Sequence, residues 1–182
     1  GVPTTVSGEP ALDAATVKPE DVRHVEVGLK TEPLSGVTAN IAVFNTEVRD
    51  YQANVVNAQV GVLRGYLANA ERVRVRGVEF DGSARVNSRL SFHGAAAYTD
   101  GTYVSFPDAP PPLEDTGGPQ VKDISGSDLP GISRWALSLG GEYIHPARVL
   151  ARAGEFYGAL DGSHRSSYSS SATASRYLVI DA

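Results

Sequence analysis

The sequence contains no cysteine and no methionine. The absence of cysteine excludes a disulfide framework and any metal site built from thiolates. Basic residues are also scarce, since 16 Lys and Arg stand against 21 Asp and Glu and give a formal net charge of −5. Proteins that bind nucleic acid present a basic surface, so this charge argues against nucleic acid as a partner.

Long hydrophobic runs and a helical periodicity are absent as well. No apolar run approaches the roughly 20 residues of a transmembrane helix, which excludes a helical membrane protein. A transmembrane β-barrel stays open, because its strands alternate apolar and polar residues. The 182 residues, 41% of them hydrophobic, are enough for one domain and its core. The chain starts at Gly1 without a signal-peptide pattern, so we expect its natural start to lie upstream.

Strict alternation of apolar and polar residues is the main pattern that is present. It is clearest in "RVRVRGVEFDGSARVNSRLSFHGAAAYTDGTY", residues 72–103, on both sides of one short turn. We predict six strands and the start of a seventh, joined as an all-β antiparallel up-and-down meander. The ranges are 22–31, 37–44, 72–86, 90–103, 135–143, 149–158 and 176–182. Glu155 and Phe156 interrupt the alternation of 149–157, so the sequence does not fix the register of that strand.

The turns predict the register of two hairpins. A three-residue turn Asn87-Ser88-Arg89 pairs Val86 with Leu90 and brings the two apolar faces together. A two-residue turn would place Arg89 opposite Val86 and move one apolar set to the wrong side. The turn Leu34-Ser35-Gly36 likewise sets Leu29 opposite Ile41.

The lengths of the connections alternate along the chain. Short connections are predicted at 34–36, 87–89 and about 144–148, and long ones at 1–21, 51–70, 100–134 and 158–175. In a meander, every second connection lies at the same end of the sheet. Tight turns at one end and long loops at the other are typical of an outer-membrane barrel, whereas a soluble Greek-key sandwich has no reason to sort its loops.

The predicted sheet has two faces of different character. Phe80, Phe92, Leu137 and Leu139 belong to an apolar face that would contact lipid in a barrel. The opposite face would line a wet lumen in a barrel or meet solvent in a soluble sheet, and it carries Glu79, Asp81, Ser83, Arg85, Ser91, His93 and Thr99. Aromatic residues resemble two interfacial girdles, with Tyr143 beside a short turn and Tyr98, Tyr103 and Trp135 at the long-loop end.

Three segments carry a resemblance to a known family. They are "VKPEDVRHVEVGLKTEPLSGVTANIAVFNTEVRDYQA" (17–53), "NAERVRVRGVEFDGSARV" (69–86) and "DISGSDLPGISRWALSLGGEY" (123–143). Each resembles a strand region of TonB-dependent outer-membrane receptors, and they occur in the order that this family has. The resemblance covers roughly residues 17–182.

The resemblance implies a function as well as a fold. The family forms plugged barrels of about 22 strands that import ferric siderophores or similar scarce nutrients. Residues 1–182 would be a partial barrel domain from the C-terminal half, without the plug and the final strands. The implied location is the outer membrane of a Gram-negative bacterium. The implied partners are a ferric-siderophore-type ligand, outer-membrane lipid and, through the missing plug region, the TonB complex. A porin-like outer-membrane channel and a soluble β-rich binding module remain as alternatives.

The patterns for catalysis and metal binding are weak. Asp115-Thr116-Gly117 is the tripeptide of aspartic proteases. This chemistry needs a second carboxylate on a matching loop, and the sequence has no second copy of the tripeptide. The four histidines are scattered, without the spacing of a zinc site. We therefore expect no enzyme and predict no catalytic, cofactor-binding or metal-binding residue. We expect the loops 100–134 and 158–175 to capture the ligand, and the sequence does not identify individual contact residues in them. Three alternating arginines, Arg72, Arg74 and Arg76, either form a solvated strand end or attract anionic ferric complexes.

Overall fold

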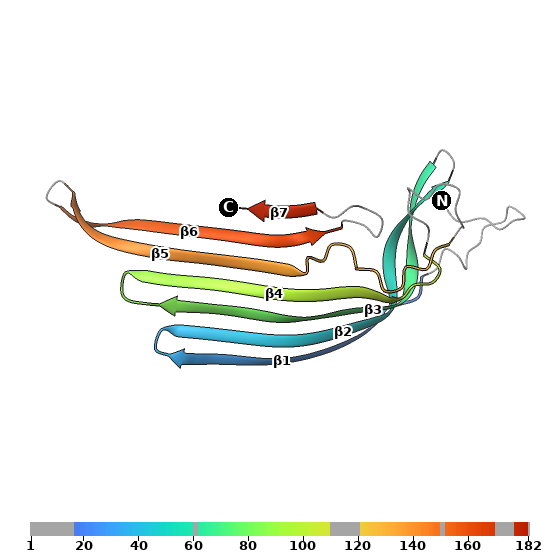
Figure 1. Ribbon diagram of the computed structural model, residues 1–182, viewed down its shortest axis with the longest axis horizontal. Helices are drawn as coiled ribbons and strands as arrows, with labels where there is room; N and C mark the ends of the chain where they lie inside the picture. The colour runs from blue at the N-terminus through green and yellow to red at the C-terminus, as the bar shows by residue number, and fades with distance from the viewer. Residues whose placement is uncertain (1–16, 60–61, 110–120, 150–151, 170–176, 182) are drawn as a thin grey trace, which may run out of the picture. The chain divides into compact units, whose positions relative to one another are not determined.

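The computed structural model describes residues 17–59, 62–109, 121–149, 152–169 and 177–181, and these form one sheet with its strands in chain order. The strand pairs β4–β5, β5–β6 and β6–β7 are antiparallel, and the described residues contain no helix, so the predicted all-β meander is confirmed (Figure 1). The strands are β1 (Asp21–Leu34), β2 (Val37–Gln59), β3 (Val62–Arg85), β4 (Leu90–Ser105), β5 (Trp135–Val149), β6 (Arg152–Tyr168) and β7 (Tyr177–Asp181).

The chain divides into two compact units. The first unit takes Gly1–Arg23, Thr46–Arg74 and Gly101–Leu129, and the second takes His24–Asn45, Val75–Asp100 and Pro130–Ala182. The second unit holds most of β1, β4, β5 and β6 and the two described tight turns. Figure 1 shows the turn after β1 and the turn after β3 at the same end of the sheet, which we call the short-turn end. Among the described residues, no helix has the length and apolarity that crossing a membrane requires.

The first hairpin turns at Ser35 and Gly36. Gly36 has φ +78°, a left-handed conformation that favours glycine and that closes a three-residue hairpin loop. Gly28 lies opposite Ala42, since a Cβ at Gly28 would come within 3.5 Å of the Ala42 Cβ. This pairing agrees with the predicted position of Leu29 opposite Ile41.

The second hairpin keeps the predicted register. The Val86 amide donates to the Leu90 carbonyl at 3.0 Å, and the Asn87 side chain accepts from the amides of Arg89 and Leu90. The same register continued along the hairpin sets Arg76 opposite Asp100, and those two side chains form an ion pair at 3.0 Å. A turn asparagine that bonds the backbone ahead of it therefore fixes both strands.

Strands β4, β5 and β6 have an unbroken register. Leu90 pairs with Tyr143 and Tyr98 with Trp135, so the apolar positions of β4 and β5 share one face. Leu160 pairs with Gly141, which assigns Phe156, Leu160 and the other even-numbered residues of β6 to that same face. Glu155 belongs to the opposite face, and the register that the sequence left open is settled by pairing with β5.

The apolar face of the second unit is exposed. Side chains of the two faces alternate along each strand, and cross-strand partners share a face. Leu160 is 81% exposed and Leu139 is 69% exposed, which a protein core would not allow. The other large apolar side chains of this face are exposed as well. They include Val25, Val27, Leu29, Ile41, Val43, Phe80, Phe92, Trp135, Leu137, Tyr143 and Phe156.

Three predicted connections are wrong, because the strands are longer than the apolar alternation. Residues 51–59 and 62–70 belong to β2 and β3, residues 158–168 belong to β6, and residues 144–148 belong to β5. A strand needs an apolar face only where that face is shielded from water. Beyond that region, polar residues can continue the hydrogen-bonded pairing with the neighbouring strand. The predicted connection 1–21 begins within residues 1–16, which lie outside the described residues.

The segment 100–134 is also more regular than predicted. β4 runs to Ser105, and the returning chain bonds along its continuation through Tyr103 with Ser127 and through Ala109 with Lys122. Pro107 and Pro130 interrupt this ladder without abolishing it, because neither is among its bonded positions. The first unit builds its core here, from Ala53, Ala70, Val73, Tyr103, Phe106, Ala109 and Leu129.

Candidate functional site

The polar face of the second unit carries side chains that bond across strands. The Asn40 amide donates to the Asp81 carboxylate at 2.8 Å, and the hydroxyls of Thr38 and Ser83 lie 2.8 Å apart. Both contacts join β2 to β3, opposite the apolar face. Exposed polar pairs of this kind would remain hydrated in a water-filled lumen.

A histidine and an aspartate reach each other across a third strand. His93 on β4 and Asp161 on β6 both pair with Gly140 on β5, and His93 Nε2 lies 2.9 Å from Asp161 Oδ1. A Cβ at Gly140 would come 2.4 Å from His93 Nε2, so the glycine leaves the space that the contact needs. The sequence assigned His93 to the polar face but gave no sign of Asp161 as its partner.

A shallow hollow of about 480 Å³ lies over β3 to β6. Small side chains line it, among them Ala95, Ala97 and Ala136, while Glu79 and Arg165 bring charges of both signs to it. Small residues on neighbouring strands let another group approach the backbone closely. The hollow and the His93–Asp161 pair both lie on this face, where they could touch a solute.

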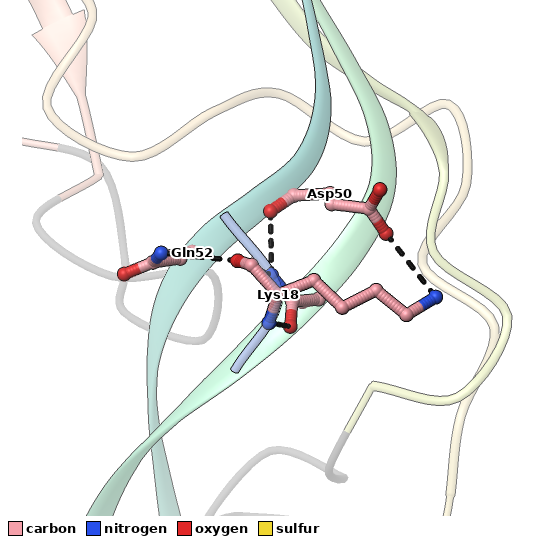
Figure 2. A network of polar contacts seen from close by, with 4 residues as sticks. Lys18, Asp50 and Gln52 are labelled. Atoms are coloured by element: carbon pink, nitrogen blue, oxygen red, sulfur yellow. Dashed lines mark hydrogen bonds and ion pairs between the residues drawn. The ribbon is translucent and has the colours of Figure 1, made fainter. Parts of the chain in front are cut away.

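The first unit holds a polar cluster around Lys18, which we call the Lys18 network (Figure 2). The Lys18 amide donates to the Asn69 side chain at 2.8 Å, and the Asn69 amide group donates back to the Lys18 carbonyl at 3.1 Å. Gln52 also donates to that carbonyl, and the Lys18 ammonium lies 3.5 Å from the Asp50 carboxylate. Figure 2 shows the Lys18 side chain extended toward Asp50.

The Lys18 network joins segments that are distant in the sequence. Lys18, Asp50 with Gln52, and Asn69 come from the stretches "VKPE", "RDYQ" and "NAE". Asp50 has φ +51°, a conformation that non-glycine residues seldom adopt, and its carbonyl accepts from Asn69. Three hydrogen bonds and one ion pair of Lys18 hold the 17–20 segment against β2 and β3, so we interpret the Lys18 network as a structural one.

The core of the first unit surrounds one tyrosine. Tyr103 is 3% exposed, and its ring contacts Phe106 at 5.4 Å and Tyr51 at 6.5 Å between centroids. Burial raises the pKa of Tyr103 to about 12, and the neighbouring Tyr51 adds to the rise. Tyr103 is therefore a core residue and not part of an interfacial girdle, which corrects the sequence-based assignment. The predicted position of Tyr143 beside a short turn is also wrong, because β5 continues past Tyr143 to Val149.

The remaining predicted groups are dispersed. Arg76 is held by Asp100 and so is not a free attractor of anions, and Asp115-Thr116-Gly117 lies outside the described residues. His145 contacts the Tyr143 hydroxyl at 3.3 Å, and His24 lies 3.6 Å from Glu26. Within the part of the chain that the structure describes, no group of three or more His, Asp or Glu is placed to hold a metal ion.

In the loop 121–134, one carboxylate organises the chain. Asp123 accepts a hydrogen bond from the Ser125 amide at 2.8 Å, and the bonds from Ser125 lower the pKa of that carboxyl. The Ser125 hydroxyl in turn accepts from the Phe106 amide at 2.9 Å. This part of the predicted capture loop is therefore pre-ordered against β4, and the sequence signal for it was the Asp-x-Ser-Gly turn.

Comparison with known proteins agrees with this geometry. A family model described as "TonB dependent receptor-like, beta-barrel" matches residues 1–182. No curated protein matches the chain. Barrel domains of that family are outer-membrane proteins of Gram-negative bacteria. The chain thus has a meander order, an exposed apolar face and a bonded polar face, as a barrel wall requires, and it belongs to the TonB-dependent receptor-like β-barrel family.

Proposed function

We propose that this chain forms part of the wall of an outer-membrane receptor that takes up ferric siderophores in a TonB-dependent way. The observation that carries the proposal is the family match over the whole chain. The exposed apolar face supports a lipid-facing wall, because such a surface would be a liability in water. The iron chelate as ligand, and a place in the C-terminal half of the barrel, rest on the sequence resemblance.

In this proposal the polar face lines the lumen. The exposed pair His93–Asp161 and the small-residue hollow offer a passing solute donors, acceptors and charges of both signs. The described return of the loop, from Val121 onward, is pre-ordered by its bonds to the chain at Tyr103, Phe106 and Ala109, so we propose that the loop as a whole contributes to ligand capture. The chemistry of the site is binding and passage, with no bond made or broken, so we propose that the chain is not an enzyme.

The decisive experiment removes the tip of that loop from the intact receptor. Residues 110–120 would be replaced by an Asn-Gly turn, which joins Ala109 to Val121 next to the existing bridge between Ala109 and Lys122. We expect normal barrel assembly and weaker uptake of labelled ferric siderophore, because outer loops are where a transporter recognises its ligand. A matched control changes the opposite end, with Ser35→Asn in the tight turn, and should leave uptake unchanged.

Two results would contradict the proposal at different levels. Unchanged uptake of every ferric chelate with loss of another nutrient would keep the receptor and remove iron as its cargo. Absence of the intact protein from the outer-membrane fraction would remove the receptor itself.

A further inference from the structure

The apolar face of β4, β5 and β6 is not smooth. A groove of about 1090 Å³ runs along it, and its apolar-face lining includes Leu90, Phe92, Leu139, Tyr143 and Leu160 with glycines between them, and Leu137 with His164 at the end away from the tight turns. Gly141 pairs with both Phe92 and Leu160, and Gly158 pairs with Tyr143. Phe92, Tyr143 and Leu160 therefore each stand beside a glycine of the neighbouring strand, which adds no side chain at that position.

The glycines of β6 leave space in the groove. A Cβ at Gly162 would meet nothing within 4 Å, and one at Gly158 would meet only the Tyr143 carbonyl, 4.0 Å away. From Leu137 to Tyr143 the groove extends along the strand for about 20 Å at roughly 3.3 Å per residue. In a strand tilted by about 45°, that length covers about 14 Å of depth, which is close to half of a hydrocarbon core of roughly 30 Å and so suits one acyl chain.

Charge at the short-turn end of the same face suggests what occupies the groove. Arg152, which pairs with Val149, lies on the apolar face. It is the single Lys, Arg, Asp or Glu on that face within residues 90–98, 135–149 and 152–164. No ion pair joins Arg152 to another described residue. His145, beside the Tyr143 hydroxyl, lies between Arg152 and the groove. An arginine without a carboxylate partner at the edge of an apolar surface is suited to a phosphate.

Beyond the other end of the groove, two aromatic residues form the next pair on the same face after Ala96–Leu137. Tyr98 and Trp135 pair across β4 and β5 with ring centroids 4.9 Å apart, and both belong to the apolar face. Such rings favour the membrane interface. The groove thus lies between a cationic group at the short-turn end and an aromatic pair beyond its other end. A single phospholipid with its headgroup at the short-turn end has the same order of charged and apolar parts.

We propose that this groove binds one anionic phospholipid, with an acyl chain along Gly158 and Gly162 and its phosphate at Arg152 and His145. The proposal rests on the proposed function, because it requires the apolar face to lie in a bilayer. A second copy of the chain is the competing occupant. It is less favoured, because a symmetric contact would bring Arg152 onto an apolar surface or close to another Arg152 without a carboxylate.

The test uses the intact receptor reconstituted in vesicles of phosphatidylethanolamine and phosphatidylglycerol, extracted in detergent and weighed by native mass spectrometry. We expect one retained phosphatidylglycerol. Gly158→Leu should fill the groove and Arg152→Gln should remove the phosphate partner, and each should reduce retention about tenfold. Gly158→Leu should leave folding intact, because glycine inside a strand is already unfavourable. Lost lipid with unchanged stability would not follow from a merely structural role.

Two control variants match these changes. Arg148→Gln alters a charge at the same end but on the polar face, and Ala39→Leu adds bulk to the apolar face on β2, outside the groove; both should retain the lipid. Equal retention in all variants would overturn the proposal, as would loss of a dimer in Gly158→Leu without any bound lipid. A receptor that transports normally and retains no phosphatidylglycerol would refute this inference alone, whereas absence from the outer membrane would refute the proposed function as well.

Discussion

Single residues in this sheet act largely by the space they leave to a neighbouring strand. Gly77 is buried, and a Cβ there would come 2.3 Å from the Tyr98 carbonyl and 2.8 Å from the Phe44 ring. Gly140 leaves room for His93 and Asp161 in the same way. Glycine weakens a strand unless something approaches its backbone closely, and at these two positions something does.

The contrast between two glycines gives a prediction. Gly77→Ala in the intact receptor should lower the free energy of unfolding by about 1–3 kcal/mol, because a backbone carbonyl must move to make room. Gly162→Ala should have no such cost, since nothing lies within 4 Å of its Cβ position. Urea unfolding of both variants measures the difference. Equal stability of the two would show that β3 and β4 are not packed as described.

Tyr103 gives a prediction about pH. Its pKa is raised to about 12, whereas in an unfolded chain the pKa of this phenol would have its ordinary value of 10.0. The folded state holds the phenol proton more tightly, so the stabilisation is complete below pH 10 and is lost as pH rises through 12. Difference absorbance of the phenolate between wild type and Tyr103→Phe should show that at most about a tenth of Tyr103 is ionised at pH 11 while the protein stays folded. Titration near pH 10 would mean that this phenol is solvated.

At the scale of the element, alternation along β5 decides what each side chain meets. Leu137 and Ser138 are neighbours in the chain, yet Leu137 pairs with Ala96 on the apolar face and Ser138 pairs with Ala95 on the polar face. The tight turns hold this arrangement in place, because a slip by one residue would exchange the two faces. The strand therefore has one side suited to lipid and one suited to water.

Two arginine substitutions test this assignment. Leu137→Arg in the intact receptor should lower stability by about 2–4 kcal/mol if the position lies near the bilayer midplane. Ser138→Arg should be much milder, because the polar face can hydrate the charge. Unfolding in lipid vesicles, followed by tryptophan fluorescence, compares the two. Similar losses from both variants would refute the two-faced assignment of β5.

At the scale of the whole molecule, the described strands form an open sheet with β1 and β7 as its outermost members. In hydrocarbon, unpaired backbone groups at such edges are costly, so spanning sheets are closed. We therefore expect that the 182-residue chain expressed alone will not insert into vesicles, while the intact receptor will. Protection from protease added outside the vesicles is the measurement. Stable insertion of the chain alone would show that its edges pair by another route.

The sequence by itself determined the class of fold and much of its register. Alternation of apolar and polar residues assigned the two faces of β4 and β5, and Asn87 and Gly36 fixed the two turns, because turn chemistry and side-chain period are local properties. The same local signals misjudged where strands end. Residues 51–59, 62–70 and 158–168 have no sustained apolar side, so only pairing with a neighbouring strand makes them extended.

The tertiary structure alone decided which distant groups meet. His93 with Asp161, and Lys18 with Asn69, are separated by 68 and 51 residues, and no spacing rule connects them. Tyr103 looked like a girdle residue in the sequence, but the loop that returns along β4 buries it. The groove beside Leu160 likewise depends on the pairing of β5 with β6, because a glycine leaves a gap only relative to the large side chains that the register places around it.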